Sequence, residues 1–239
     1  MEKVNLSPRS LPKSIVKVTD QGSVECSIPQ WKRTLDRLLV LVSAPLWGAV
    51  YLLCAIWIKL LSPGPVFFRQ ERVGYRQECF LIYKFRTMHE GTDTVVHEHY
   101  VQQLIQQGGA MQKLDHHDTR IIRGGTFLRA SGLDELPQLL NVIRGEMSLV
   151  GPRPCTPKEL QDYPENYKKR FAGLPGMTGN WQVNGKNETS FARMIALDIL
   201  YFRKASIWLD LRIIMRTVPT IVKQIGHLRL NSQRPINEK

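Results

Sequence analysis

Cysteine is scarce in this sequence, and no two cysteines lie close together. The 239 residues include only Cys26, Cys54, Cys79 and Cys155, and no C-x-x-C pair occurs. This spacing signals neither a disulfide framework nor a cysteine-based zinc site, and it indicates a reducing compartment. The four histidines between residues 92 and 118 also lack metal-ligand spacing, so we interpret them as solvated loop residues.

Acidic residues are scarce relative to basic ones. Asp and Glu total 21 against 33 Lys and Arg, which gives a formal net charge of +12 at pH 7. Such an excess favours an anionic partner, either nucleic acid, lipid headgroups or a phosphorylated substrate, although a merely soluble basic surface would also show it. The sequence contains no zinc finger, helix-turn-helix or aromatic-basic RNA motif, which argues against nucleic acid.

Charge is absent altogether between Leu38 and Ile58. This run is about as long as a membrane-spanning helix requires, and Pro45 inside it would bend a helix axis. Lys and Arg flank the run on both sides, at positions 32, 33 and 37 and at positions 59, 69 and 72. Because these residues concentrate on the cytoplasmic side of a membrane, we predict a re-entrant helix over 31–61 that enters and leaves by one face. A straight crossing is the alternative.

The remaining segments predict a mostly helical α+β domain over 62–226, between a flexible tail (1–30) and a C-terminal tail (227–239). The tail 1–30 has no apolar core close to its start, so it is not a signal peptide. Short apolar runs at 66–68 and 80–85 predict a small hairpin. Helical patterns occur within 92–118 and over 133–143, 190–205 and 206–225. The last is basic and amphipathic, which suits either a membrane surface or packing on a core.

Two adjacent carboxylates, Asp134 and Glu135, stand in the segment "SGLDELPQ". Asp134 has the position of a helix N-cap, and capping alone is the ordinary use of such a residue. Arg129 precedes the pair, however, and Arg153 follows it between two prolines that stiffen the backbone. Arginine suits bidentate phosphate recognition. We therefore hypothesise that one acid attacks phosphorus while the other holds Mg²⁺ between phosphate oxygens.

A set of motifs in a fixed order relates this chain to a known protein family. They are "KRTLD" (32–36), "SPGPVFFRQERVG" (62–74), "YKFRTM" (83–88), "FLRASGLDELPQLLNVIRGEMSLVGPRP" (127–154), "LPGMTGNWQVNGK" (174–186) and "DILYFRKASIWLDLRII" (198–214). Through them the chain resembles the bacterial sugar transferase family of monotopic phosphoglycosyl transferases. The family's helix break would fall near Gly48 and Ala49, whereas Pro45 of this chain lies about one turn earlier.

The resemblance implies a fold and a reaction. The fold would be α+β and mostly helical, with an N-terminal re-entrant helix, a small hairpin and amphipathic surface helices at the cytoplasmic face of the bacterial inner membrane. The enzyme would transfer a sugar-1-phosphate from a UDP-sugar to undecaprenyl phosphate, with Mg²⁺, and release UMP. A covalent aspartyl-phosphosugar intermediate is implied, as is a role in starting a lipid-linked glycan such as O-antigen, capsule, exopolysaccharide or a glycoprotein glycan.

The same resemblance implies roles for ten side chains. Asp134 would be the nucleophile and Glu135 the Mg²⁺ ligand. The remaining eight would bind substrate: Arg129 and Arg153 at phosphates, Lys84 and Arg86 at a headgroup or phosphate, Thr178 and Gln182 near the nucleotide, and Asp198 and Asp210 as late acids of the family pattern.

The implied partners are the UDP-sugar, undecaprenyl phosphate and membrane lipids, with no nucleic acid, and the resemblance is compatible with a homodimer. Two alternatives of other classes are a membrane-tethered basic protein that binds nucleic acid and a scaffold without activity. Titration with duplex DNA across salt concentrations tests the nucleic-acid alternative. Release of UMP distinguishes an enzyme from both alternatives.

Overall fold

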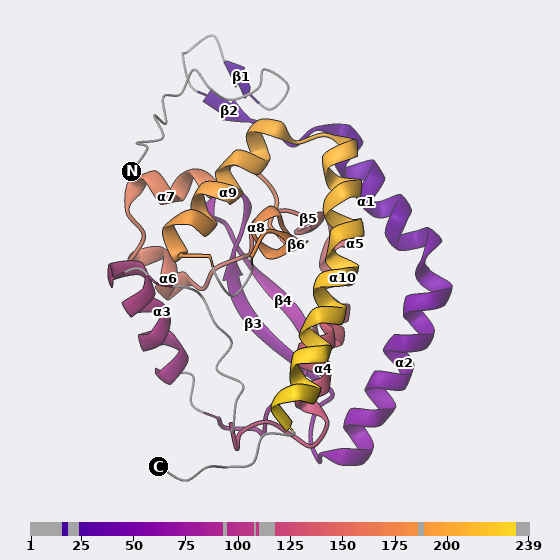
Figure 1. The fold of residues 1–239 in the computed structure, drawn as a ribbon. Helices are drawn as coiled ribbons and strands as arrows, with labels where there is room; N and C mark the ends of the chain where they lie inside the picture. Colours follow the sequence, from indigo (N-terminus) through magenta and orange to yellow (C-terminus); the bar gives the residue numbers. More distant parts are fainter. Residues whose placement is uncertain are drawn as a thin grey trace.

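The computed structural model describes residues 16–18, 24–92, 95–107, 109, 118–185 and 189–232. Figure 1 shows a helical body around one long hairpin. In chain order the elements are β1 (Val16–Val18), β2 (Val24–Cys26), α1 (Gln30–Val42), α2 (Ala44–Leu61), β3 (Phe67–Val73), η2 (Tyr75–Gln77), β4 (Cys79–Phe85), α3 (Val95–Gln107), α4 (Gly125–Ser131), η3 (Leu133–Gln138), α5 (Leu139–Arg144), β5 (Ser148–Val150), α6 (Pro157–Gln161), α7 (Glu165–Lys168), η4 (Lys169–Ala172), β6 (Gly176–Thr178), α8 (Asn180–Val183), α9 (Phe191–Lys204) and α10 (Ile207–Ser232), where η denotes a 3₁₀-helix. The predicted mostly helical α+β fold is confirmed.

The hairpin of β3 and β4 is the largest of three two-stranded sheets in the described parts of the chain. Its strands are antiparallel, with Phe67 opposite Phe85 and Val73 opposite Cys79. The predicted hairpin is therefore confirmed, although β3 is longer than the apolar run that indicated it. Strands β5 and β6 pair in parallel, and β1 pairs antiparallel with β2 inside the stretch predicted to be a flexible tail.

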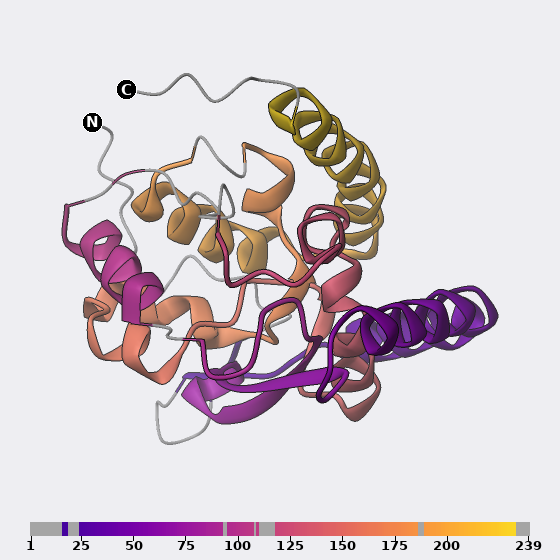
Figure 2. The same cartoon turned by 90° about the horizontal axis from the view of Figure 1, so that it is seen from below.

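The apolar segment forms two helices rather than one. Helix α1 ends at Val42 and α2 begins at Ala44, so the break lies at Ser43, whose hydroxyl donates to Leu39 O at 2.6 Å. Pro45 occupies the first turn of α2, where a missing N–H costs nothing. The bend therefore precedes the proline, and it lies earlier than the family pattern places it. Figure 2 shows the two helices projecting from the rest of the molecule.

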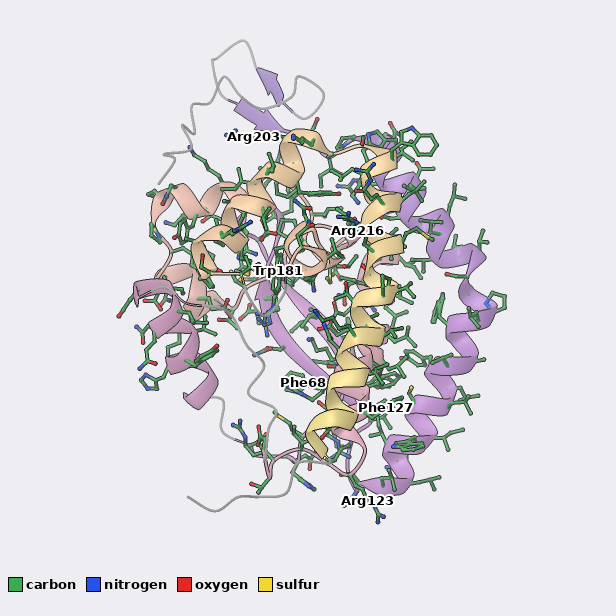
Figure 3. All side chains as sticks on the ribbon, in the orientation of Figure 1. Phe68, Arg123, Phe127, Trp181, Arg203 and Arg216 are labelled. Atoms are coloured by element: carbon green, nitrogen blue, oxygen red, sulfur yellow. The ribbon has the colours of Figure 1, made fainter. Side chains whose placement is uncertain are left out.

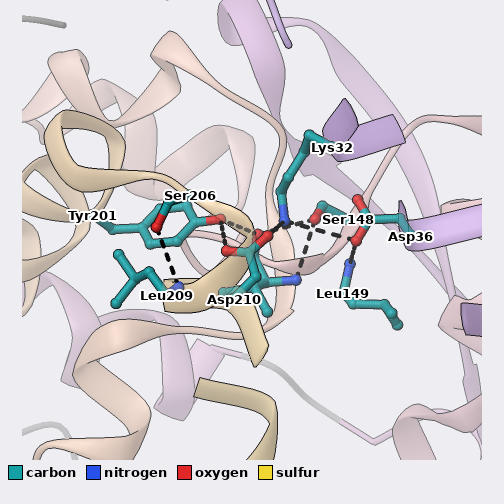
Figure 4. Close-up of polar contacts among 9 residues, drawn as sticks. Lys32, Asp36, Ser148, Leu149, Tyr201, Ser206, Leu209 and Asp210 are labelled. Atoms are coloured by element: carbon teal, nitrogen blue, oxygen red, sulfur yellow. Dashed lines mark hydrogen bonds and ion pairs between the residues drawn. The ribbon is translucent and has the colours of Figure 1, made fainter. Parts of the chain in front are cut away.

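Helix α1 is fixed to the body by a buried polar cluster (Figure 4). Lys32 Nζ donates to Asp210 Oδ2 at 2.6 Å and lies 3.7 Å from Asp36 Oδ1. Tyr201 donates to the other oxygen of Asp210 at 2.6 Å. Burial and the Asp210 carboxylate raise the pKa of Tyr201 well above its ordinary value, so its hydroxyl stays a donor. Lys32, one of the predicted flanking charges, is therefore a buried ion-pair partner rather than a free cation.

The C-terminal end of α2 is fixed by Arg86 of the segment that follows β4. Its Nη1 donates to Pro63 O at 2.7 Å and its Nη2 donates to Ser62 O at 3.0 Å. Backbone carbonyls beyond a helix end need such donors when they are buried. Both outer ends of the helix pair are therefore bound to the same body, while Leu41, Val42 and Ser43 at the bend are exposed.

Helix α10 packs on the core, which is one of the two roles that its sequence left open. Ile213 is buried against Val150, Tyr201 and Phe202, so one face packs on the core. The opposite face leaves Met215 71% exposed, and it also carries exposed Trp208, Val218 and Val222. Figure 3 shows Phe127 of α4, another exposed apolar side chain, near the lower half of α10. The helices predicted over 190–205 and 206–225 are confirmed, and α10 continues to Ser232.

Candidate active site

The two adjacent acids lie in η3, a short 3₁₀-helix. Gly132 precedes this helix with φ of 73°, a left-handed conformation that favours glycine, and Glu135 N donates to Gly132 O at 3.0 Å. The prediction that Asp134 is the N-cap of an α-helix is wrong, because Gly132 occupies that position and Pro137 lies within the 3₁₀ turn. The predicted helix over 133–143 is consequently divided into η3 and α5.

The side chain of Asn141 holds this segment against the hairpin. Its Oδ1 accepts from Tyr83 N at 3.2 Å, and its Nδ2 donates to Leu81 O at 2.7 Å. These bonds replace the strand partner that the edge of β4 would otherwise lack. Asn141 is fully buried, so water cannot compete for the bonds. The position of η3 over β4, and of the acids beside Lys84, follows from this attachment.

A cavity of about 500 Å³ lies between the hairpin, α3, η3, the loop around Arg153 and helix α8. Seven of the ten site residues predicted from the sequence line it: Lys84, Arg86, Arg129, Asp134, Glu135, Arg153 and Gln182. They come from segments up to about a hundred residues apart in the chain. The fold therefore gathers most of the predicted site at one cavity.

The environments of the two acids differ. Asp134 is only 6% exposed, whereas the side chain of Glu135 is 35% exposed and accepts from Lys84 Nζ at 2.8 Å. Arg129 and Arg153 line the same cavity. Arg153 stands between Pro152, whose carbonyl accepts from Gly176 N at 2.8 Å, and Pro154. A buried carboxylate beside a half-exposed one, with cations around both, suits nucleophilic attack on an anionic group.

Comparison with known proteins agrees with this arrangement. The family model described as bacterial sugar transferase matches residues 28–224. The chain belongs to the bacterial sugar transferase family. This transferase is 38% identical to the exopolysaccharide production protein ExoY of Rhizobium meliloti over 197 residues, which cover 82% of the chain and 87% of ExoY.

Two further relatives carry names that state a reaction. The UDP-glucose:undecaprenyl-phosphate glucose-1-phosphate transferase of Caulobacter vibrioides is 40% identical over 200 residues, which cover 80% of the transferase and 69% of the relative. The undecaprenyl-phosphate galactose phosphotransferase of Salmonella typhimurium is 34% identical over 201 residues. Those residues cover 82% of the transferase and 41% of that longer protein. The resemblance inferred from the motifs is confirmed, and with it the assignment of the chain as an enzyme of this class.

Three of the predicted substrate-binding residues of the transferase do not line the cavity and have hydrogen-bond partners within the protein. Asp198 is 1% exposed and accepts from Arg170 Nη2 at 2.6 Å, and Asp210 belongs to the cluster that holds α1. Burial raises the pKa of Asp198, while the attraction of Arg170 opposes the rise. The hydroxyl of Thr178 is 2.8 Å from that of Thr217 in α10. In this structure both aspartates are buried ion-pair partners and neither lines the cavity, so their contact with substrate stays a prediction.

Arg86 lines the cavity but uses two nitrogens to bind the end of α2, so its position serves the helix pair as well. Conversely, Arg72, Glu159 and Trp181 also line the cavity, although the sequence patterns did not indicate them as site residues. Arg72 lies within the quoted motif "FRQERVG", where it was interpreted only as a flanking charge. An arginine near the end of a strand at a polar turn gives no signal, in sequence alone, that it will be buried.

Proposed function

We propose that the transferase moves a sugar-1-phosphate from a UDP-sugar to undecaprenyl phosphate and releases UMP. The observation that carries this proposal is the position of Asp134 and Glu135 at one cavity with Lys84, Arg129 and Arg153. Relatives of the chain are named for glucose- and galactose-phosphate transfer to undecaprenyl phosphate, and ExoY is named for exopolysaccharide production. The product would start a lipid-linked glycan.

The chemistry of the site accounts for two displacements. A carboxylate oxygen of Asp134 attacks the phosphorus that carries the sugar, and the bond from that phosphorus to the UMP oxygen breaks. UMP leaves with the bonding electron pair, and an aspartyl phosphosugar is left. An oxygen of undecaprenyl phosphate then attacks the same phosphorus, breaks the bond to Asp134 and regenerates the carboxylate. Lys84, Arg129 and Arg153 would stabilise the charge on the phosphates throughout.

Magnesium fits this site through Glu135. Among the described residues no three His, Cys, Asp or Glu side chains form a metal cluster. Mg²⁺ commonly uses only one or two carboxylates together with substrate phosphates, and the half-exposed Glu135 at the cavity suits that arrangement. The ion would neutralise phosphate charge when bound. The Glu135 carboxylate also accepts a hydrogen bond from Lys84 Nζ at 2.8 Å, which fixes its orientation.

Residues of α8 support a nucleotide at the same cavity. Gln182 Oε1 and Trp181 Nε1 are buried, and neither has a hydrogen-bond partner in the described part of the protein. Both side chains line the cavity. One atom is an acceptor and the other a donor, and the imide edge of uracil presents both kinds of group. A uracil ring placed there would satisfy polar atoms that are costly to leave unpaired.

We also propose that α1 and α2 form a re-entrant membrane hairpin at the cytoplasmic face of the inner membrane. Helix α2 is long and apolar enough to enter a membrane, and its leucines at 46, 52, 53 and 60 are exposed. Ion-pair and hydrogen-bond contacts hold both outer ends of the pair to one body. A chain with both ends on one side leaves the membrane by the face through which it entered.

Cysteine labelling tests this topology. In a background without other cysteines, native Cys79 and Ser27→Cys report on the body and on the start of α1, and Val42→Cys reports on the bend. We expect a membrane-impermeant maleimide to leave all three unlabelled in intact cells. In inverted vesicles it should label positions 27 and 79 but not 42, which lipid would cover. Labelling of position 27 in intact cells while Cys79 stays protected would show a true crossing.

Transfer itself is tested with a panel of UDP-sugars, undecaprenyl phosphate and Mg²⁺, with UMP measured as the product. We expect at least one UDP-hexose to release UMP only when the enzyme is present, and removal of Mg²⁺ with a chelator to stop the reaction. Release of UMP from none of the panel would contradict the proposal. Duplex DNA serves as the control ligand, and salt-dependent binding to it would favour the nucleic-acid alternative instead.

A further inference from the structure

The side chain of Arg72 in β3 is buried in the cavity wall with unused hydrogen-bond donors. It is 7% exposed and lines the cavity. Its Nη2 donates to Gln70 Oε1 at 2.6 Å, and its Nη1 lies 3.6 Å from Glu159 Oε1. Neither Nε nor Nη1 has a hydrogen-bond acceptor among the described residues. Leaving buried N–H groups of a cation without acceptors costs free energy.

A second guanidinium adds to this cost. Burial lowers the pKa of Arg72, and the like charge of Arg153 lowers it further, whereas the carboxylates of Glu159 and Glu135 oppose the decrease. Arg153 is half-buried, and it lines the same cavity as Arg72 and Glu135. A buried cation and a half-buried one that repel each other at the wall of a cavity are the arrangement expected of an anion site.

The neighbours of Arg72 indicate which part of a substrate would reach it. Asp134 and Glu135 line the same cavity as Arg72, and so do Trp181 and Gln182, to which we assign the uracil. A UDP-sugar that holds its sugar phosphate at the acid pair and its uracil at α8 must also place in this cavity the phosphate that departs with uridine. Arg72 offers that phosphate two buried N–H donors that have no acceptor among the described residues.

We infer that Arg72, together with Arg153, forms the subsite for the nucleotide phosphate, and that it stabilises the charge of the departing UMP. This inference rests on the proposed function and extends it to a residue outside the predicted site. Glu159 is the resident counter-charge of Arg72, at 3.6 Å, and it competes weakly with the phosphate. The rival explanation is that Arg72 and Glu159 are only a structural ion pair.

Ligand pairs that differ by one phosphate separate the two explanations. The full-length protein in detergent is titrated with UMP and with uridine, and affinity is taken from the concentration dependence of the thermal shift. We expect Arg72→Gln to weaken UMP binding by about tenfold to a hundredfold, the usual range for a charge-assisted bidentate contact, and to leave uridine binding unchanged. Arg72→Lys should weaken UMP binding less, because it keeps the charge but loses the planar fork.

Glu159→Gln is the matched control. Removal of the counter-charge should tighten UMP binding several-fold without a change for uridine, whereas a purely structural pair predicts lower stability and the same affinity. If Arg72→Gln alone does not fold, Arg72→Gln/Glu159→Gln leaves no unpaired buried carboxylate and should still lose UMP affinity.

Wild-type UMP affinity in both the Arg72→Lys and the double variant would overturn the subsite, as would equal binding of UMP and uridine by the wild type. UMP release by the wild type from UDP-sugars tests the proposed function independently, so the two ideas can fail separately.

Discussion

Replacement of Asp134 by asparagine is expected to reduce UMP release by roughly three orders of magnitude or more, the scale seen when a catalytic nucleophile is removed. The amide is nearly isosteric with the carboxylate, and Asp134 does not cap a helix in this structure, so the fold should survive. Initial rates with UDP-sugar, lipid acceptor and saturating Mg²⁺ measure the effect. A melting temperature close to that of the wild type serves as the control for folding.

Glu135→Gln is the matched variant at the neighbouring position. It should also be severely impaired, but by weaker metal binding, so added Mg²⁺ should recover part of the rate. The loss of the Lys84 ion pair should change stability little, because both side chains are partly exposed. Full activity of Asp134→Asn, or recovery of that variant by Mg²⁺, would show that Asp134 is not the nucleophile.

Replacement of Arg170 by methionine is expected to lower the free energy of unfolding by about 3–5 kcal/mol, the cost of breaking a buried ion pair on one side. Both partners are almost completely buried, with side chains 2% and 1% exposed, and Arg170 also donates to Tyr163 and to Arg153 O. The carboxylate of Asp198 would be left without its counter-charge. Chemical denaturation measures the loss.

Two controls make this result specific. The pair Arg170→Met/Asp198→Leu removes both charges and should recover much of the lost stability. Glu165→Gln breaks the exposed pair with Lys168 and should cost less than about 1 kcal/mol. A stable Asp198→Asn protein with impaired binding of UDP-sugar would instead favour the original interpretation of Asp198 as a substrate ligand.

The family, the helical fold and most of the residues gathered at the candidate site could be predicted from the sequence because local patterns carry them. The hairpin, α9 and α10 follow from apolar spacing, and the acid pair lies in an ordered set of motifs. Such motifs indicate which residues are important, but they do not show whether a residue binds substrate or stabilises the fold. Asp198 and Asp210 match the family pattern, yet the structure pairs them with Arg170 and Lys32, and such long-range partners leave no local signal.

The exact position of the helix break and the type of helix at the acid pair could not be predicted from the sequence patterns either. A proline in an apolar run predicts a bend at the proline, but Pro45 fits the first turn of α2 and the break moved to Ser43. Similarly, "SGLDELPQ" has the composition of an α-helix start, and the left-handed Gly132 and Pro137 produce a 3₁₀ turn instead. Arg72 was missed because its burial depends on how the hairpin packs against Glu159 and Arg153.

The most direct test of the proposed covalent route is peptide mass spectrometry of the enzyme after incubation with a UDP-sugar and Mg²⁺ in the absence of lipid acceptor. After acid quenching and proteolysis, we expect the peptide containing Asp134 to gain the mass of one phosphosugar, with the fragment ions placing it on that residue. The adduct should disappear when undecaprenyl phosphate is added before quenching. An adduct on Glu135 would reverse the roles of the two acids. Unmodified peptide from an enzyme that still releases UMP from UDP-sugar under the same conditions would contradict a covalent aspartyl intermediate.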